Sequence, residues 1–122
     1  MFEVGASVRF RAFHVMPEQP PPEDRRHAHD YRVEVVAERE GLDDRGMVCD
    51  LEVLTTALGD VADRLRDRDL SEVCGADPVT VEVLASWIHD RLAPAVRADG
   101  AEVLGVRVWE SEDAFGGTRA TV

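Results

Sequence analysis

The chain has 122 residues, a net charge of −11, a hydrophobic content of 44% and a charged content of 32%. The length predicts a single domain, residues 1–122, and the composition is typical of a soluble globular protein. The acidic charge argues against nucleic acid as a partner, because binding to phosphates needs a basic face. No apolar run approaches the roughly 18 residues of a membrane span, and the first residues lack a secretory pattern, so we expect no membrane contact and a cytoplasmic protein.

Two segments in the first third of the chain alternate apolar and polar residues, which predicts strands. Residues 2–14 place their apolar side chains and His14 on one face. Residues 27–38 do the same, with His27 and His29 on the apolar face. The segment between them carries four prolines, which cannot donate to a strand ladder, so we expect a loop.

Two helices are expected in the middle of the chain. Apolar residues recur at three- and four-residue spacing from Leu51 to Leu65, which predicts an amphipathic helix. Residues 66–78 are interpreted as a polar turn. The second helix is expected to begin near Asp77-Pro78, because proline is favoured in a first turn, and to end before Gly100.

Two further strands, residues 102–110 and 114–122, complete the chain. The order is therefore β-β-α-α-β-β. It predicts an α+β fold in which two helices cover one face of an antiparallel sheet. His89, in the second helix, is interpreted as a surface residue.

Three histidines form a candidate metal site. His27 and His29 are two residues apart in a strand, so both side chains point to one face, with Cα atoms about 6.5–7 Å apart. His14 ends the preceding strand and would lie beside them if the strands pair. Three imidazoles with an open fourth position form a catalytic zinc geometry, in which zinc acts as a Lewis acid. The alternative is a strand face that is merely polar.

Five motifs, in order and with matching spacing, resemble those of the 6-pyruvoyl-tetrahydropterin synthases and the related 6-carboxy-tetrahydropterin synthases. No single motif is specific, but together they cover almost the whole chain. They are F-x-A-x-H at Phe10–His14, H-G-H-N-Y at His27–Tyr31, G-M-V-x-D-F at Gly46–Leu51, P-T-x-E-N at Val79–Val83 and V-x-V-x-E-T at Val106–Ser111.

The resemblance implies the tunnelling fold, or T-fold, in which trimeric barrels stack into a homo-hexamer with sites between subunits. It implies 7,8-dihydroneopterin triphosphate as the substrate of family enzymes, and zinc bound by His14, His27 and His29. It implies that Glu110 anchors the pterin by accepting hydrogen bonds from its 2-amino group and its ring N–H. A carboxylate is suited to this role because it can accept two parallel hydrogen bonds. It also implies that Thr80 lines the pterin pocket.

The residues that carry the family's proton chemistry are replaced. Glu23 stands four residues before the first histidine of H-G-H, where the family has a cysteine. The only cysteines, Cys49 and Cys74, lie elsewhere and are expected to be buried, reduced thiols. Arg66 and Asp67 stand where the family has an Asp-His pair, and an arginine cannot act as a base. Glu23 and Asp67 are the remaining candidate acid–base residues.

Three functions therefore stay open. The first is a family member that binds a pterin- or purine-like ring and performs other chemistry or none. The second is a Glu23-dependent, aldolase-type enzyme that cleaves the dihydroneopterin side chain to 6-hydroxymethyl-dihydropterin, as some family members with Glu near this position do. The third is an active carboxy-tetrahydropterin synthase. Glu23 lies beside Asp24 in the proline-rich loop, where a solvated acidic loop is the alternative interpretation, and zinc occupancy is equally open.

Overall fold

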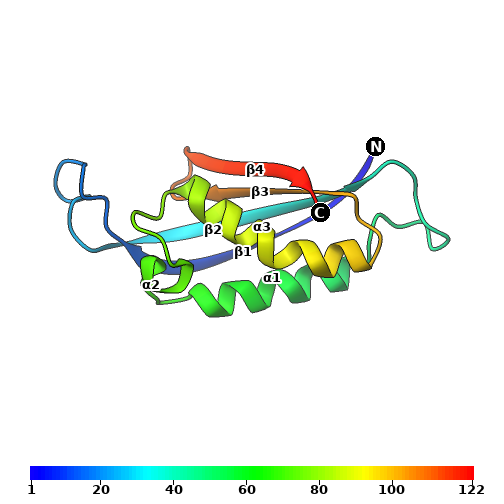
Figure 1. The fold of residues 1–122 in the computed structure, drawn as a ribbon, viewed down its shortest axis with the longest axis horizontal. Coiled ribbons are helices and arrows are strands. Elements are labelled where there is room, and N and C mark those ends of the chain that lie inside the picture. The colour runs from blue at the N-terminus through cyan, green and yellow to red at the C-terminus, as the bar shows by residue number, and fades with distance from the viewer.

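The computed structural model describes residues 1–122 and consists of one four-stranded antiparallel sheet with helices on a single face (Figure 1). The strands are hydrogen-bonded in the order β1-β2-β3-β4. The predicted α+β class with a one-sided helical layer is confirmed. The elements are β1 (Phe2–His14), β2 (His27–Arg39), α1 (Leu51–Leu65), α2 (Leu70–Cys74), α3 (Val81–Ala98), β3 (Val103–Trp109) and β4 (Phe115–Thr121).

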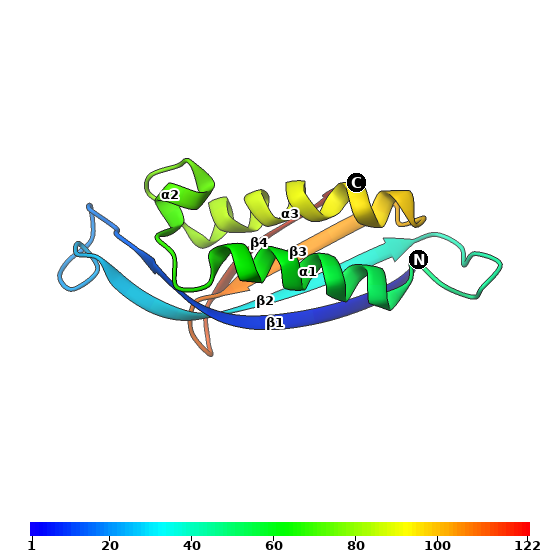
Figure 2. The same ribbon diagram turned by 90° about the horizontal axis from the view of Figure 1, so that it is seen from below.

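The core lies between the sheet and the two long helices, and Figure 2 shows these as two layers. α1 packs over β1, and α3 packs over β3 and β4. Every second residue of the central strands is buried against the helices because side chains alternate across a strand. The inward-facing residues of β2 and β3 include Val33, Val35, Ala37, Leu104, Val106 and Val108. None of the helices is long and apolar enough to cross a membrane.

Residues 66–78 are expected from the sequence to form a polar turn, but residues 70–74 within this segment form the short helix α2. The carboxylate of Asp69 caps this helix by accepting a hydrogen bond from the backbone N–H of Ser71 at 3.2 Å. Gly75 ends it in the left-handed conformation, with φ of 66°. Leu70 is fully buried, so tertiary packing stabilises a helix that is too short to show a periodic pattern.

Two further expectations about α3 are wrong. The helix begins at Val81 rather than at Pro78, because the hydroxyl of Thr80 caps it by accepting from the backbone N–H three residues on, at 3.1 Å. His89 is buried rather than on the surface, with 8% of its area exposed. Its Nε2 lies 3.3 Å from the carbonyl oxygen of Ala120 on β4, so it lies where the edge strand packs on the helix.

One end of the sheet gathers the segments that carry the candidate site. β1 and β2 pair along their full length, so His14 lies opposite His27. The loop between them folds back on itself, because the N–H of Met16 donates to the carbonyl of Glu23 at 2.8 Å. Figure 2 shows this loop at the same end of the molecule as α2.

Candidate functional site

Three imidazoles converge at the end of β1 and β2. His14 and His27 are register partners, and His29 is the next inward-facing residue of β2. The ring centroids are 4.4 Å apart for His14 and His27, and 4.9 Å apart for each of the other two pairs. The structure therefore brings together the three residues that strand pairing predicted to meet.

Backbone carbonyls orient two of these rings. Nδ1 of His14 lies 3.2 Å from the carbonyl oxygen of Val79, and Nδ1 of His27 lies 2.6 Å from that of Arg25. A carbonyl can only accept, so each Nδ1 carries the proton, and a neutral ring then has a lone pair on Nε2. Burial lowers the pKa of His14, which favours its neutral form. Its Nε2 is buried without a hydrogen-bond partner, and Nε2 of His27 lies 3.1 Å from Nε2 of His29.

This donor set fits a metal ion. The ligand atoms of His14, Glu23, His27 and His29 all lie within 4.8 Å of one another. A buried nitrogen without a hydrogen-bond partner is energetically unfavourable unless a ligand binds it. Neutral imidazoles are the commonest protein ligands of transition-metal ions such as zinc. The cluster could therefore hold a metal.

Glu23 belongs to this cluster rather than to a freely solvated loop. Its Oε2 lies 2.9 Å from Nε2 of His27 and 3.9 Å from Nε2 of His29. The folded-back loop positions it, and 43% of its side chain stays exposed. A carboxylate is thus held next to the imidazoles and remains accessible to a ligand.

A pocket of about 290 Å³ opens beside the cluster and contains the residues expected to bind the ring. The carboxylate of half-buried Glu110 has no hydrogen-bond or ion-pair partner in the chain. The hydroxyl of Thr80 accepts from the backbone of α3, which leaves its proton free for a ligand. The sequence alone did not assign Met16 and Gln19 to the pocket. They lie in an irregular loop, which has no repeating hydrophobic pattern from which the direction of a side chain could be predicted. The lining residues are His14, Met16, Gln19, Glu23, Thr80, Val81, Glu82 and Glu110.

Asp67 does not reach the histidine cluster within this chain. It is exposed, with φ of 59°, and its backbone N–H donates to the carbonyl of Arg11 at 2.7 Å. The side chain of its neighbour Arg66 pairs with Asp63, three residues earlier on α1. This segment therefore runs along the outer edge of β1 and gives the pocket no acid–base group from its own chain.

Neither cysteine belongs to the histidine cluster or lines the pocket beside it. Cys49 is buried, Cys74 is half-buried, and both are free thiols, broadly as expected. Burial raises the pKa of both, that of Cys74 to about 11. Both are therefore protonated near neutral pH.

A family model described as 6-pyruvoyl tetrahydropterin synthase matches residues 3–120. The chain belongs to this family. Almost the whole domain, including the histidine cluster and the pocket beside it, lies within the match. No curated protein matches the sequence.

Solved structures of 6-pyruvoyl tetrahydropterin synthases are similar to this chain over nearly their full length. The Caenorhabditis elegans enzyme is 18% identical, with 98% of this chain and 95% of that chain covered and a TM-score of 0.72. The Plasmodium falciparum enzyme is 14% identical, with coverages of 98% and 99% and a TM-score of 0.74. A Plasmodium vivax variant, in which a glutamate described as a catalytic residue is replaced by alanine, is 13% identical over 100% of both chains, with a TM-score of 0.75. The chain therefore has the T-fold of this family.

Proposed function

We propose that this family member binds a pterin- or purine-like ring in the pocket beside the histidine cluster and does not catalyse the standard synthase reaction. One observation carries the proposal: the unpaired carboxylate of Glu110, the hydroxyl of Thr80 and the ring of His14 line the same pocket. A carboxylate accepts two parallel hydrogen bonds, which matches an amino group next to a ring N–H. Ligands of this class carry that pair of donors.

Zinc is the metal that we propose for the cluster, with His14, His27 and His29 as its ligands. When bound, it would polarise an oxygen of the ligand as a Lewis acid. The carbonyls of Val79 and Arg25 hold the Nδ1 protons of two of these rings and so aim their Nε2 atoms into the cluster. Support comes from the unpartnered Nε2 of His14, which these contacts leave facing the other rings.

A second candidate function is favoured by the position of Glu23. Its carboxylate contacts Nε2 of His27 and lines the ligand pocket, so it could accept a proton from the side chain of a bound dihydroneopterin. Two Plasmodium vivax synthase structures carry changes at a glutamate described as a catalytic residue, so a glutamate serves in catalysis in a protein of this family. The product of such an aldolase-type reaction would be 6-hydroxymethyl-dihydropterin.

We also propose a homo-hexamer, a dimer of trimers, with sites between subunits. β1 and β4 are the two edges of the sheet, and the segment after α1 covers the edge of β1 only near Arg11 and Phe13. The rest of each edge presents unpaired backbone groups that another copy can satisfy. Multi-angle light scattering at micromolar concentration should therefore return six times the mass of the chain. A monomer under these conditions would exclude this assembly.

Replacing Glu110 by glutamine should weaken the binding of neopterin. Glutamine keeps the shape but loses the charge and one of the two acceptors, which corresponds to about 1.5–3 kcal/mol, or roughly 10–150-fold in affinity. Isothermal titration calorimetry measures this directly. Glu112→Gln is the matched control, because Glu112 is exposed in the same turn and does not line the pocket beside the histidines. Equal affinity of the wild type and Glu110→Gln would contradict the role of Glu110.

A further inference from the structure

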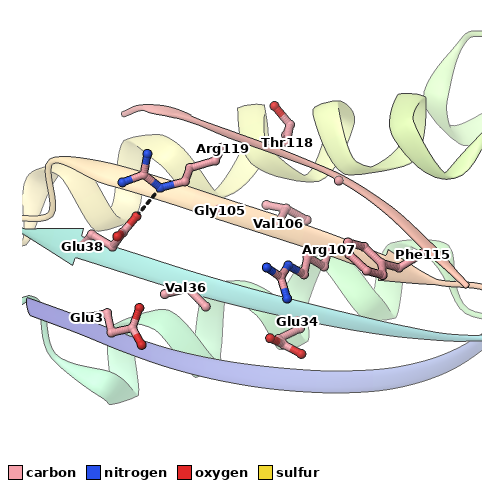
Figure 3. Close-up of a pocket in the computed structure, with 11 residues that line it drawn as sticks. Glu3, Glu34, Val36, Glu38, Gly105, Val106, Arg107, Phe115, Thr118 and Arg119 are labelled. Atoms are coloured by element: carbon pink, nitrogen blue, oxygen red, sulfur yellow. Dashed lines mark hydrogen bonds and ion pairs between the residues drawn. The ribbon is translucent and has the colours of Figure 1, made fainter. Parts of the chain in front are cut away.

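The face of the sheet that carries no helices has a pocket of its own, about 510 Å³ in volume (Figure 3). The β3–β4 register pairs Gly105 with Arg119, and Arg107 with Gly117. These four residues share the open face, because residues two apart in a strand point the same way. The two glycines therefore leave a hollow between two arginines on neighbouring strands.

The two arginines differ in what they bind. Nε of Arg119 donates to Oε2 of Glu38 at 2.7 Å, so its charge is already paired. Arg107 has no carboxylate partner, and its guanidinium instead lies over the ring of Phe115, 5.0 Å from the centroid. A guanidinium that lies over an aromatic ring makes no hydrogen bond to it, so its N–H donors remain available for a carboxylate.

A carboxylate of opposite charge lies across from Arg107 without binding it. Glu34 on β2 is the register partner of Arg107 on β3, and both line the pocket. Opposite charges at facing positions ordinarily pair, yet Oε2 of Glu34 accepts from Arg32 at 3.3 Å and its Oε1 has no partner. Figure 3 shows the two side chains on neighbouring strands, with Phe115 beside the guanidinium. The pocket thus offers a free cationic group and a free carboxylate oxygen side by side.

We propose that this pocket binds an α-amino acid with an aromatic side chain. Its carboxylate would bind Arg107 and its ammonium group would bind Glu34. Its ring would pack against the exposed part of Phe115, whose own ring also lies 4.5 Å from that of Trp109. The volume lies within the range of about 300–1,000 Å³ that is usual for small-molecule sites. A multiply charged anion such as a phosphate ester fits poorly, because Glu3, which has no ion-pair partner, and Glu34 line the same pocket and would repel it. The site lies on the face opposite the histidine cluster and is independent of the function proposed above.

Calorimetric titration with three related compounds tests the proposal. L-Tryptophan carries both charges, tryptamine lacks the carboxylate and indole-3-propionate lacks the amine. Tryptophan should saturate the protein, and each analogue should bind at least ~10-fold more weakly, because each loses one charged hydrogen-bonding group. Arg107→Gln and Glu34→Gln should lower the affinity for tryptophan by a similar factor. Arg97→Gln, on the exposed end of α3, is the control and should bind tryptophan like the wild type.

A variant that fills the pocket without changing its charge shows whether tryptophan binds in the pocket or is only attracted by the charges around it. A Cβ atom at Gly105 would lie 3.8 Å from the carbonyl oxygen of Val36 and 3.9 Å from Cβ of Arg119, which are ordinary contacts. Gly105→Leu should therefore fill the hollow, abolish tryptophan binding and keep a cooperative thermal unfolding transition. The proposal is wrong if tryptophan does not bind, if tryptamine binds as tightly as tryptophan, or if Arg107→Gln or Gly105→Leu binds tryptophan like the wild type.

Discussion

The purified protein should convert no measurable 7,8-dihydroneopterin triphosphate into 6-pyruvoyl-tetrahydropterin. The reaction moves protons on the ligand side chain, so it needs a base beside the ligand and a second group that exchanges protons near neutral pH. Glu23 supplies a carboxylate at the first position. At the second position, where the resemblance to the family implies a histidine, this chain has Asp67, which is exposed and lies outside the cluster of its own chain. A positioned general acid or base typically raises the reaction rate by ~10²–10⁴-fold. Without an effective second group, turnover should therefore fall below easy detection.

Incubation with the substrate, followed by chromatography of the pterins, measures this outcome. Robust formation of the pyruvoyl product would overturn the proposal that the standard reaction is lost. Release of 6-hydroxymethyl-dihydropterin that disappears in Glu23→Ala would support the aldolase-type function instead. Glu18→Ala is the matched control, because Glu18 lies exposed in the same loop and is outside the cluster.

Replacing His27 by alanine should leave the protein without zinc. The proposed site holds the ion through three imidazoles, and even the loss of a group that only supports a ligand typically costs ~10–100-fold in metal affinity. Wild-type protein with zinc at about 100 times its dissociation constant should gain about 2.7 kcal/mol of stability, a shift that His27→Ala should lose. Elemental analysis and thermal unfolding with and without added zinc measure both effects.

Glu23→Gln distinguishes a base from a fourth metal ligand. If Glu23 is a base, this variant should keep the zinc content of the wild type, because the three imidazoles remain. Loss of zinc in Glu23→Gln would make Glu23 a ligand and would argue against its role in proton transfer. A wild-type protein that contains no zinc and shows no thermal shift would contradict the metal proposal and leave the ring-binding proposal standing.

Local patterns were sufficient to predict the strands, the first helix and the convergence of the histidines. The alternation in residues 2–14 and 27–38 fixes which side chains face the helices, and β1 and β2 have these bounds to within one residue. His27 and His29 share a face for the same reason, and a long hairpin brings His14 to them. These features depend only on residues close together in sequence and on one antiparallel strand pairing, so they can be predicted from the amino-acid sequence.

Features that depend on distant contacts could not be predicted. α2 is too short to show a period and depends on the burial of Leu70, while the burial of His89 depends on β4 packing against α3. The position of Glu23 depends on how an irregular loop closes. The hollow on the open face requires the register that sets Gly105 opposite Arg119, which no single strand reveals.

A crystal structure of the protein soaked with neopterin tests most directly whether the pocket beside His14 binds a pterin ring. We predict that the ring occupies this pocket, with its 2-amino group and neighbouring N–H about 2.7–3.2 Å from the carboxylate oxygens of Glu110. The hydroxyl of Thr80 should lie at the edge of the same ring. A ring bound elsewhere on the protein, or one in this pocket that makes no hydrogen bond to Glu110, would contradict the account.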